Sequence, residues 1–88
     1  MSVYGVSKLL FRAEHEPDFL ALLKSQPEAA FAQLPLSPAE ITALTAGDVK
    51  ALFDMGVHAF LLNHLPRHGM FGVTPQNYFP RIRGQEQP

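Results

Sequence analysis

Residues 48–69, DVKALFDMGVHAFLLNHLPRHG, carry an apolar stripe of helical period in a chain of 88 residues. Hydrophobic side chains recur there at steps of three and four, the spacing of one helical face. The stripe consists of Val49, Leu52, Phe53, Val57, Phe60, Leu61 and Leu65, and Met55, Ala59 and Leu62 add a second apolar face. A helix that is apolar on nearly all sides is expected to be buried on all sides. We therefore predict that this stretch is the central helix of a small domain, and a candidate to dock on another protein.

Strong signals for helix boundaries lie before this stretch and within it. Ser37-Pro38-Ala39-Glu40 has the pattern of a capping box, and the helix that it starts is expected to run to Ala46 and stop at Gly47. Gly56 either ends a helix in a left-handed conformation or allows close packing inside a longer one, and we favour the break. Pro66 is expected to kink or end the central element near residue 65.

The rest of the chain continues the helical pattern. We expect helices over residues 3–15, from Pro17 and over residues 27–34, a last turn over residues 75–79, and a frayed tail over residues 81–88. No stretch alternates between apolar and polar residues for long enough to predict a strand. The sequence therefore predicts one all-α domain over residues 1–88, with five to six short helices around a central apolar helix.

The composition limits the classes of function. Hydrophobic residues make up 47% of the chain, charged residues 17%, and cysteine is absent. The low charge is typical of a subunit that covers part of its surface with a partner. The net charge of −1 argues against nucleic-acid binding, although the three arginines of residues 55–88 could face an anion. No apolar run approaches the ~18 residues of a membrane helix, and the N-terminal segment becomes charged too early for a secretory signal. We expect a cytoplasmic protein that binds no membrane.

The histidines are the first candidates for chemistry. His64 and His68 are four residues apart, a spacing that can place two imidazoles on one helical face for a metal, and His58 lies close by. Pro66 lies between the pair and no third ligand follows, so we favour histidines at an interface or at helix ends, and predict no metal site. No nucleophile elbow or phosphate-binding loop is present. We predict no catalytic residue in this chain.

Residues 67–79, RHGMFGVTPQNYF, combine aromatic side chains with cations. Such a segment is either a recognition edge or a lid that folds back on the core. Both alternatives remain open at this point.

The order of these features resembles the LigA-like family, the small (alpha) subunits of protocatechuate 4,5-dioxygenase, a class III extradiol ring-cleavage dioxygenase. The similarity is carried by QPEAAFAQLPLSPAEITALTAGDVKALFDMGVHAFLLNHLPRHGMFG, residues 26–72, and covers about residues 6–73. It rests on the helical pattern and a few glycines rather than on a catalytic motif. The chain differs from the family's longer members after residue 73, where only a short segment follows.

This resemblance implies a small helical subunit that packs on a large (beta) subunit and covers the mouth of its active site. The large subunit of such enzymes holds a non-haem Fe(II), and the small one binds no cofactor itself. Phe71 is the closest match to the family's pocket-lining phenylalanine, with a glycine–phenylalanine spacing one residue shorter. We expect Arg67 and His68 to lie near the same mouth, where they could bind an aromatic acid substrate.

The predicted partner interface follows from the apolar helix. It contains His58, Phe60, Leu61, Leu62 and His64. Without its partner, a chain with such a face is expected to form a homo-oligomer. The alternative to an aromatic-catabolism oxidoreductase subunit is a free-standing LigA-like docking module for a modifying enzyme, with no role in ring cleavage.

Overall fold

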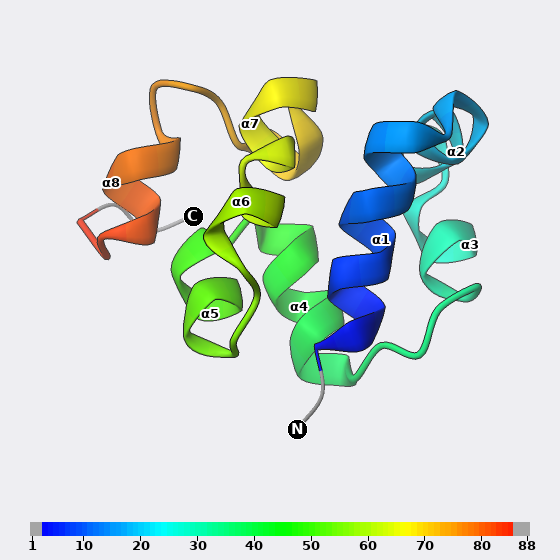
Figure 1. The fold of residues 1–88 in the computed structure, drawn as a ribbon, viewed down its shortest axis with the longest axis horizontal. Coiled ribbons are helices and arrows are strands. Elements are labelled where there is room, and N and C mark those ends of the chain that lie inside the picture. The colour runs from blue at the N-terminus through cyan, green and yellow to red at the C-terminus, as the bar shows by residue number, and fades with distance from the viewer. Residues whose placement is uncertain (1–2, 86–88) are drawn as a thin grey trace.

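The computed structural model describes residues 3–85 and is helical almost throughout (Figure 1). Eight α-helices and one 3-10 helix follow one another, and no strand occurs within these residues. The helices are α1 (Tyr4–His15), α2 (Pro17–Ser25), α3 (Pro27–Phe31), α4 (Pro38–Ala46), α5 (Val49–Asp54), α6 (Ala59–Leu62), α7 (His64–His68), η1 (Met70–Gly72) and α8 (Tyr78–Ile82). The predicted all-α class is confirmed, with more and shorter helices than the five to six expected.

The capping box at the start of α4 is present as predicted. The Ser37 backbone N–H donates to Glu40 Oε1 at 2.7 Å, and the Glu40 N–H donates to Ser37 Oγ at 3.2 Å. The helix ends at Gly47, whose φ of 67° is left-handed. A Cβ on Gly47 would lie 2.5 Å from the carbonyl oxygen of Phe71, so both the backbone conformation and the space require glycine here.

The predicted central helix is divided into three pieces. Gly56 has a φ of 109° and separates α5 from α6, which confirms the break that we favoured. Pro66 interrupts the central element a few residues before the predicted position and itself lies inside α7. Proline has no N–H to donate to the carbonyl one turn earlier, at Leu62, and the helix is interrupted there, between α6 and α7. This division explains the additional helices.

The C-terminal segment is more ordered than predicted. Helix α8 extends to Ile82, and Arg81 Nη1 donates to the Gly47 carbonyl oxygen at 3.2 Å. Residues 81 and 82, the first of the predicted frayed tail, thus belong to a helix that contacts the end of α4. The rest of the predicted tail forms a turn up to Gln85, and residues 86–88 lie outside the described residues.

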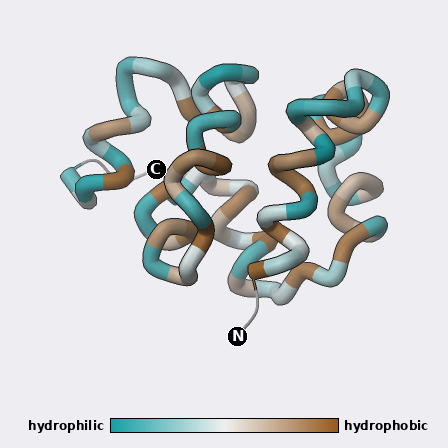
Figure 2. Tube along the Cα trace, in the orientation of Figure 1, coloured by the Kyte–Doolittle hydropathy of each residue, from teal (hydrophilic) through white to brown (hydrophobic). Residues whose placement is uncertain are grey.

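The helices pack around one core. Helix α1 contacts α2 on one side and α6 and α7 on the other, α4 packs on α5, and α5 packs on α8 (Figure 1). Figure 2 shows hydrophobic residues along α6, the helix between α1 and α5. The buried hydrophobic residues include Val6, Leu9, Leu10, Leu23, Leu44, Val49, Leu52, Val57, Leu62, Leu65 and Val73.

The expectation that the central stretch is buried on all sides was wrong. Leu52, Val57 and Leu65 are at most 1% exposed, but Phe53 is 47% and Phe60 is 70% exposed. The breaks between the three short helices change the phase of the apolar stripe, and a chain of this length has too few residues to cover every apolar side chain.

Candidate functional site

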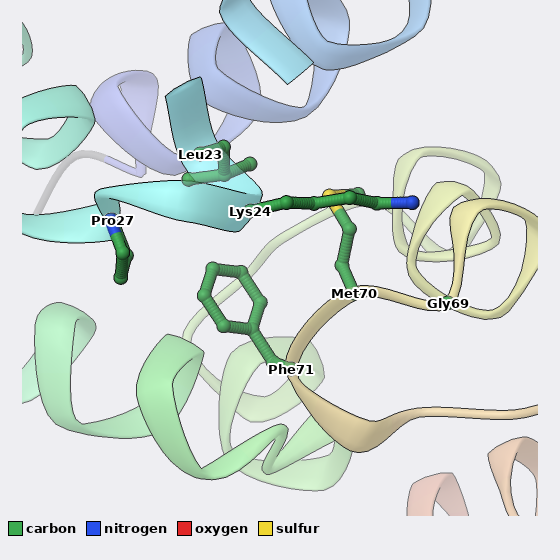
Figure 3. Close-up of a pocket in the computed structure, with 6 residues that line it drawn as sticks. All are labelled: Leu23, Lys24, Pro27, Gly69, Met70 and Phe71. Atoms are coloured by element: carbon green, nitrogen blue, oxygen red, sulfur yellow. The ribbon is translucent and has the colours of Figure 1, made fainter. Parts of the chain in front are cut away.

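A surface cavity of about 370 Å³ lies between the end of α2 and the turn that follows α7. Its walls come from two segments that are far apart in the sequence. The lining residues are Leu23, Lys24, Pro27, Gly69, Met70 and Phe71 (Figure 3). Leu23 and Met70 are each 2% exposed, so the cavity opens directly onto the hydrophobic core.

Phe71 is held in an unusual backbone conformation at this cavity. Its φ of 54° and ψ of 31° are left-handed, and among residues 3–85 it is the one non-glycine residue with a positive φ. A bulky residue in this region costs about 1–3 kcal/mol and persists only where the surrounding structure enforces it. The left-handed Gly69 before it ends α7 and turns the chain, and the Phe71 ring stacks on Phe31 with 6.0 Å between centroids. The segment therefore directs one aromatic ring towards α3, which agrees with the alternative in which it folds back on the core.

Lys24 is the only charged residue among those that line the cavity. Its side chain extends from the end of α2 away from Pro27 (Figure 3). Within residues 3–85, no hydrogen bond or ion pair engages its ammonium group. The cavity thus combines apolar walls with one available positive charge.

Arg67 and His68, which we expected beside Phe71, do not line this cavity. Both contact Glu14 of α1 instead: Arg67 Nη1 lies 3.1 Å from Glu14 Oε2, and His68 Nε2 lies 2.8 Å from Glu14 Oε1. The hydrogen bond with His68 lowers the pKa of the Glu14 carboxyl below its ordinary value, and the nearby charges of Arg67 and His64 act in the same direction, whereas desolvation opposes them. The expected pair of cations is thus already occupied by a carboxylate of this chain.

His64 lies inside the protein rather than on its surface. It is 6% exposed, and its Nδ1 lies 3.2 Å from the Leu10 carbonyl oxygen. A carbonyl oxygen can only accept, so Nδ1 carries a proton, and the other ring nitrogen, Nε2, faces Glu14 Oε1 at 3.9 Å. His64 therefore links α7 to α1.

The predicted interface residues separate into two groups. Leu62 is 0% exposed and His64 is nearly buried, so neither can lie on an open surface of the folded chain, which corrects the sequence interpretation. Phe60 and His58 are exposed and Leu61 is half-buried. His58 also has a local role, since its Nδ1 accepts a hydrogen bond from the Phe60 N–H at 3.0 Å and caps α6.

Helix α1 exposes a second group of aromatic residues that sequence reasoning missed. Tyr4 is 61% and Phe11 is 50% exposed, and these two residues are seven apart, on one face of the helix. Phe11 lies between Lys8, whose Nζ is 6.0 Å from the ring centroid, and His15, whose ring centroid is 4.3 Å away. The spacing of residues 4, 8, 11 and 15 is visible in the sequence and could have indicated this face.

The described residues show neither a metal cluster nor a membrane-spanning helix. Within residues 3–85, no three histidine, aspartate or glutamate side chains are grouped so that they could hold a metal ion. In the same range, no helix has both the length and the apolar character needed to cross a membrane.

Comparisons with known proteins leave the family undecided. No protein-family model matches the chain, and no curated protein or solved structure shows significant similarity to it.

Proposed function

We propose that this chain is a small, non-catalytic subunit that packs on a larger protein, and that the partner is the large subunit of an Fe(II)-dependent extradiol ring-cleavage dioxygenase. The Fe(II) and the catalytic groups belong to the partner in this proposal, and a cytoplasmic location is part of it. The family is taken from the resemblance over residues 26–72. The packing role is supported by the large hydrophobic side chains that remain exposed on the surface.

The observation that carries the packing role is the number of large hydrophobic side chains that remain exposed. Five such residues stay between 47% and 70% exposed in the described part of the chain: Tyr4, Phe11, Phe53, Phe60 and Phe79. Aromatic side chains dominate the energetics of protein interfaces, and exposed groups of them indicate interaction sites. Phe60 is the most exposed of the five, on a helix that packs beside α1.

Phe60 is linked to the buried side of α1 through one intermediate residue, His64. The Phe60 ring lies 6.1 Å from the ring of His64, edge to face, and His64 reaches the backbone of α1 at Leu10. Phe11 follows Leu10 in the same helix. We therefore propose α1 and α6 as the docking surface, with Phe60 and Phe11 as its anchors.

Within this proposal, Phe71 supplies an aromatic wall to the shared substrate site. Its enforced backbone conformation supports a specific task for the ring, because a strained residue is retained where function or packing requires it. Arg67 and His68 are poor candidates for binding the acid group of the substrate, since both already contact the Glu14 carboxylate.

A second candidate function is a docking module for a modifying enzyme. It is favoured because the proposed docking surface and the cavity at Phe71 are separate: the exposed aromatic residues of α1 and α6 do not line the cavity. A docking role needs only the first of these surfaces, so it would leave the cavity without a part in ring cleavage.

The test is affinity purification of the tagged chain from its native lysate, with the co-purified protein identified and its iron content measured. We expect a larger non-haem iron protein that cleaves catechol-type aromatic acids only when the small chain is present. Phe60→Asp should abolish co-purification. Phe79→Asp is the matched control, because Phe79 is also an exposed phenylalanine but belongs to α8, which packs on α5.

The outcomes separate the candidates. If a modifying enzyme without iron co-purifies, the chain is a docking module and the dioxygenase hypothesis is refuted. Elution of the chain alone, or equal binding by the two aspartate variants, would overturn the proposed docking surface.

A further inference from the structure

We infer that the exposed face of α1 binds an acidic amphipathic helix of a partner protein, whose carboxylates meet Lys8 and His15 on the two sides of Phe11. This inference rests on the proposed docking surface of α1 and α6, and it adds the kind of segment that this surface recognises. The face is separate from the cavity at Phe71, because none of its residues lines that cavity.

Two aromatic rings lie on the exposed face of α1, seven residues apart. Tyr4 is 61% and Phe11 is 50% exposed. Seven residues of helix rise about 10 Å, and a helix laid along α1 repeats its own apolar side chains at the same interval. One face of an extended strand repeats at about 6.6 and 13 Å instead, so it cannot match both rings. The spacing therefore favours a helical partner segment.

Phe11 has a nitrogen-bearing side chain on each side along the same face. Lys8 Nζ lies 6.0 Å from the centroid of the Phe11 ring, and the centroid of the His15 ring lies 4.3 Å from it. Within residues 3–85, no hydrogen bond or ion pair engages either side chain. The ammonium has three N–H donors, and even a neutral imidazole has one. A carboxylate beside an apolar group that packs on Phe11 can therefore accept a hydrogen bond on either side.

The acidic residues of α1 do not compete for these donors. Glu14 contacts α7, and Glu16 pairs with Arg12 at 3.2 Å. The exposed part of α6 and its cap, residues 58–60, contains no acidic residue. The docking surface thus presents N–H donors and a cation around its aromatic anchor, without an unpaired carboxylate of its own. Charge complementarity at an interface selects partners by sign, so this surface selects an acidic one.

The experiment is an NMR titration of the full chain at low ionic strength with two synthetic helical peptides. Both have the same length and the same large apolar residues seven positions apart. Glutamate flanks each apolar residue in the first peptide, and lysine does so in the second. We expect saturable shifts at residues 4–15 and about tenfold tighter binding of the glutamate peptide. This difference should shrink at high salt, because exposed charge pairs are screened.

Lys8→Glu should reverse the order of the two peptides, since attraction to the glutamate peptide becomes repulsion. Lys8 is exposed, so this variant is expected to fold normally, and an unfolded variant would lose both peptides rather than exchange them. Lys24→Glu is the matched control, because it changes the net charge equally at an exposed lysine in the last turn of α2. It should leave the order of the peptides unchanged.

Three results would overturn the inference. They are the absence of saturable shifts at residues 4–15 with the glutamate peptide, equal effects of the two lysine variants, and tighter binding of single-stranded oligothymidylate or of vesicles that contain phosphatidylserine. The titration needs no dioxygenase, so its outcome is separate from the co-purification. A co-purified iron protein with an unresponsive α1 would refute the acidic helix alone, and bound peptide without an iron protein would refute the dioxygenase alone.

Discussion

Replacing Leu62 by alanine should destabilise the protein strongly, whereas Phe60→Ala, two residues earlier in the same short helix, should change the stability very little. Leu62 is 0% exposed and Phe60 is 70% exposed. Both were predicted from the sequence to meet a partner, so this pair of variants tests directly which of the two faces the core.

The expected magnitudes are well separated. Leu→Ala at a fully buried position costs about 3–5 kcal/mol, because apolar contacts are lost and a cavity remains. A domain of this length has a total stability of about 4–13 kcal/mol, so the loss is a large part of it. At about 4–8 °C per kcal/mol, the Tm of Leu62→Ala should fall by about 12–40 °C. Phe60→Ala should stay within about 0.5 kcal/mol of the unmodified chain, as is usual for surface positions.

The assay is urea unfolding followed by far-UV circular dichroism, repeated at a low and a high protein concentration. The midpoint should move for Leu62→Ala with an unchanged slope, and Leu61→Ala, at a half-buried position, should be intermediate. Equal losses for Leu62→Ala and Phe60→Ala at the low concentration would refute the described orientation of α6. A loss for Phe60→Ala that appears only at the high concentration would show that Phe60 takes part in self-association.

Three further predictions follow from the backbone, the charges and the surface. Gly47→Ala should destabilise the protein more than Gly56→Ala in thermal unfolding, because both glycines have positive φ but only at Gly47 does the new methyl group meet another residue; equal Tm values would contradict the close packing there. The pKa of Glu14 is lowered in the folded state, so the ionised carboxylate stabilises the folded protein fully above the ordinary value of 4.5, and this stabilisation is lost as the pH falls through the lower folded value. Glu14→Gln should therefore reduce the loss of stability in acid, measured as urea midpoints over a series of pH values. The chain alone should form a homodimer or a higher oligomer, and light scattering that gives a monomer throughout a dilution series would refute this.

The helix boundaries could be predicted because their causes are local. Pro17 and Pro27 each occupy the first position of a helix, and the side chain of Ser37 needs only its neighbour three residues later to cap α4. Such signals depend on a few adjacent residues, which are visible in the sequence. Pro66 is the exception, since a proline is tolerated in the first turn of a helix as short as α7.

The candidate sites could be predicted only in part because their residues are distant in the sequence. Phe71 was identified, but neither Arg67 nor His68 lines the cavity beside it. Both contact Glu14, which precedes them in the sequence by 53 and 54 residues. The charged residue that lines the cavity is Lys24 of α2. Nothing in the spacing of charges along a chain determines which distant carboxylate will meet which arginine, since this depends on how α1 packs on α7.

The misassignment within residues 48–69 has a physical cause that bears on function. A continuous helix would have kept its apolar stripe in phase, but the break at Gly56 and the new start at His58 rotate α6, so that Leu62 enters the core and Phe60 leaves it. The stretch therefore contains more apolar surface than the core of this chain can accommodate. An exposed phenylalanine at such a position gives no stability to the monomer, and in water it favours association by the same burial of apolar surface that folds the chain. The excess hydrophobicity that suggested one central helix is thus better understood as two apolar surfaces in one sequence, one that forms the core and one, around Phe60, that we propose to be covered by a partner.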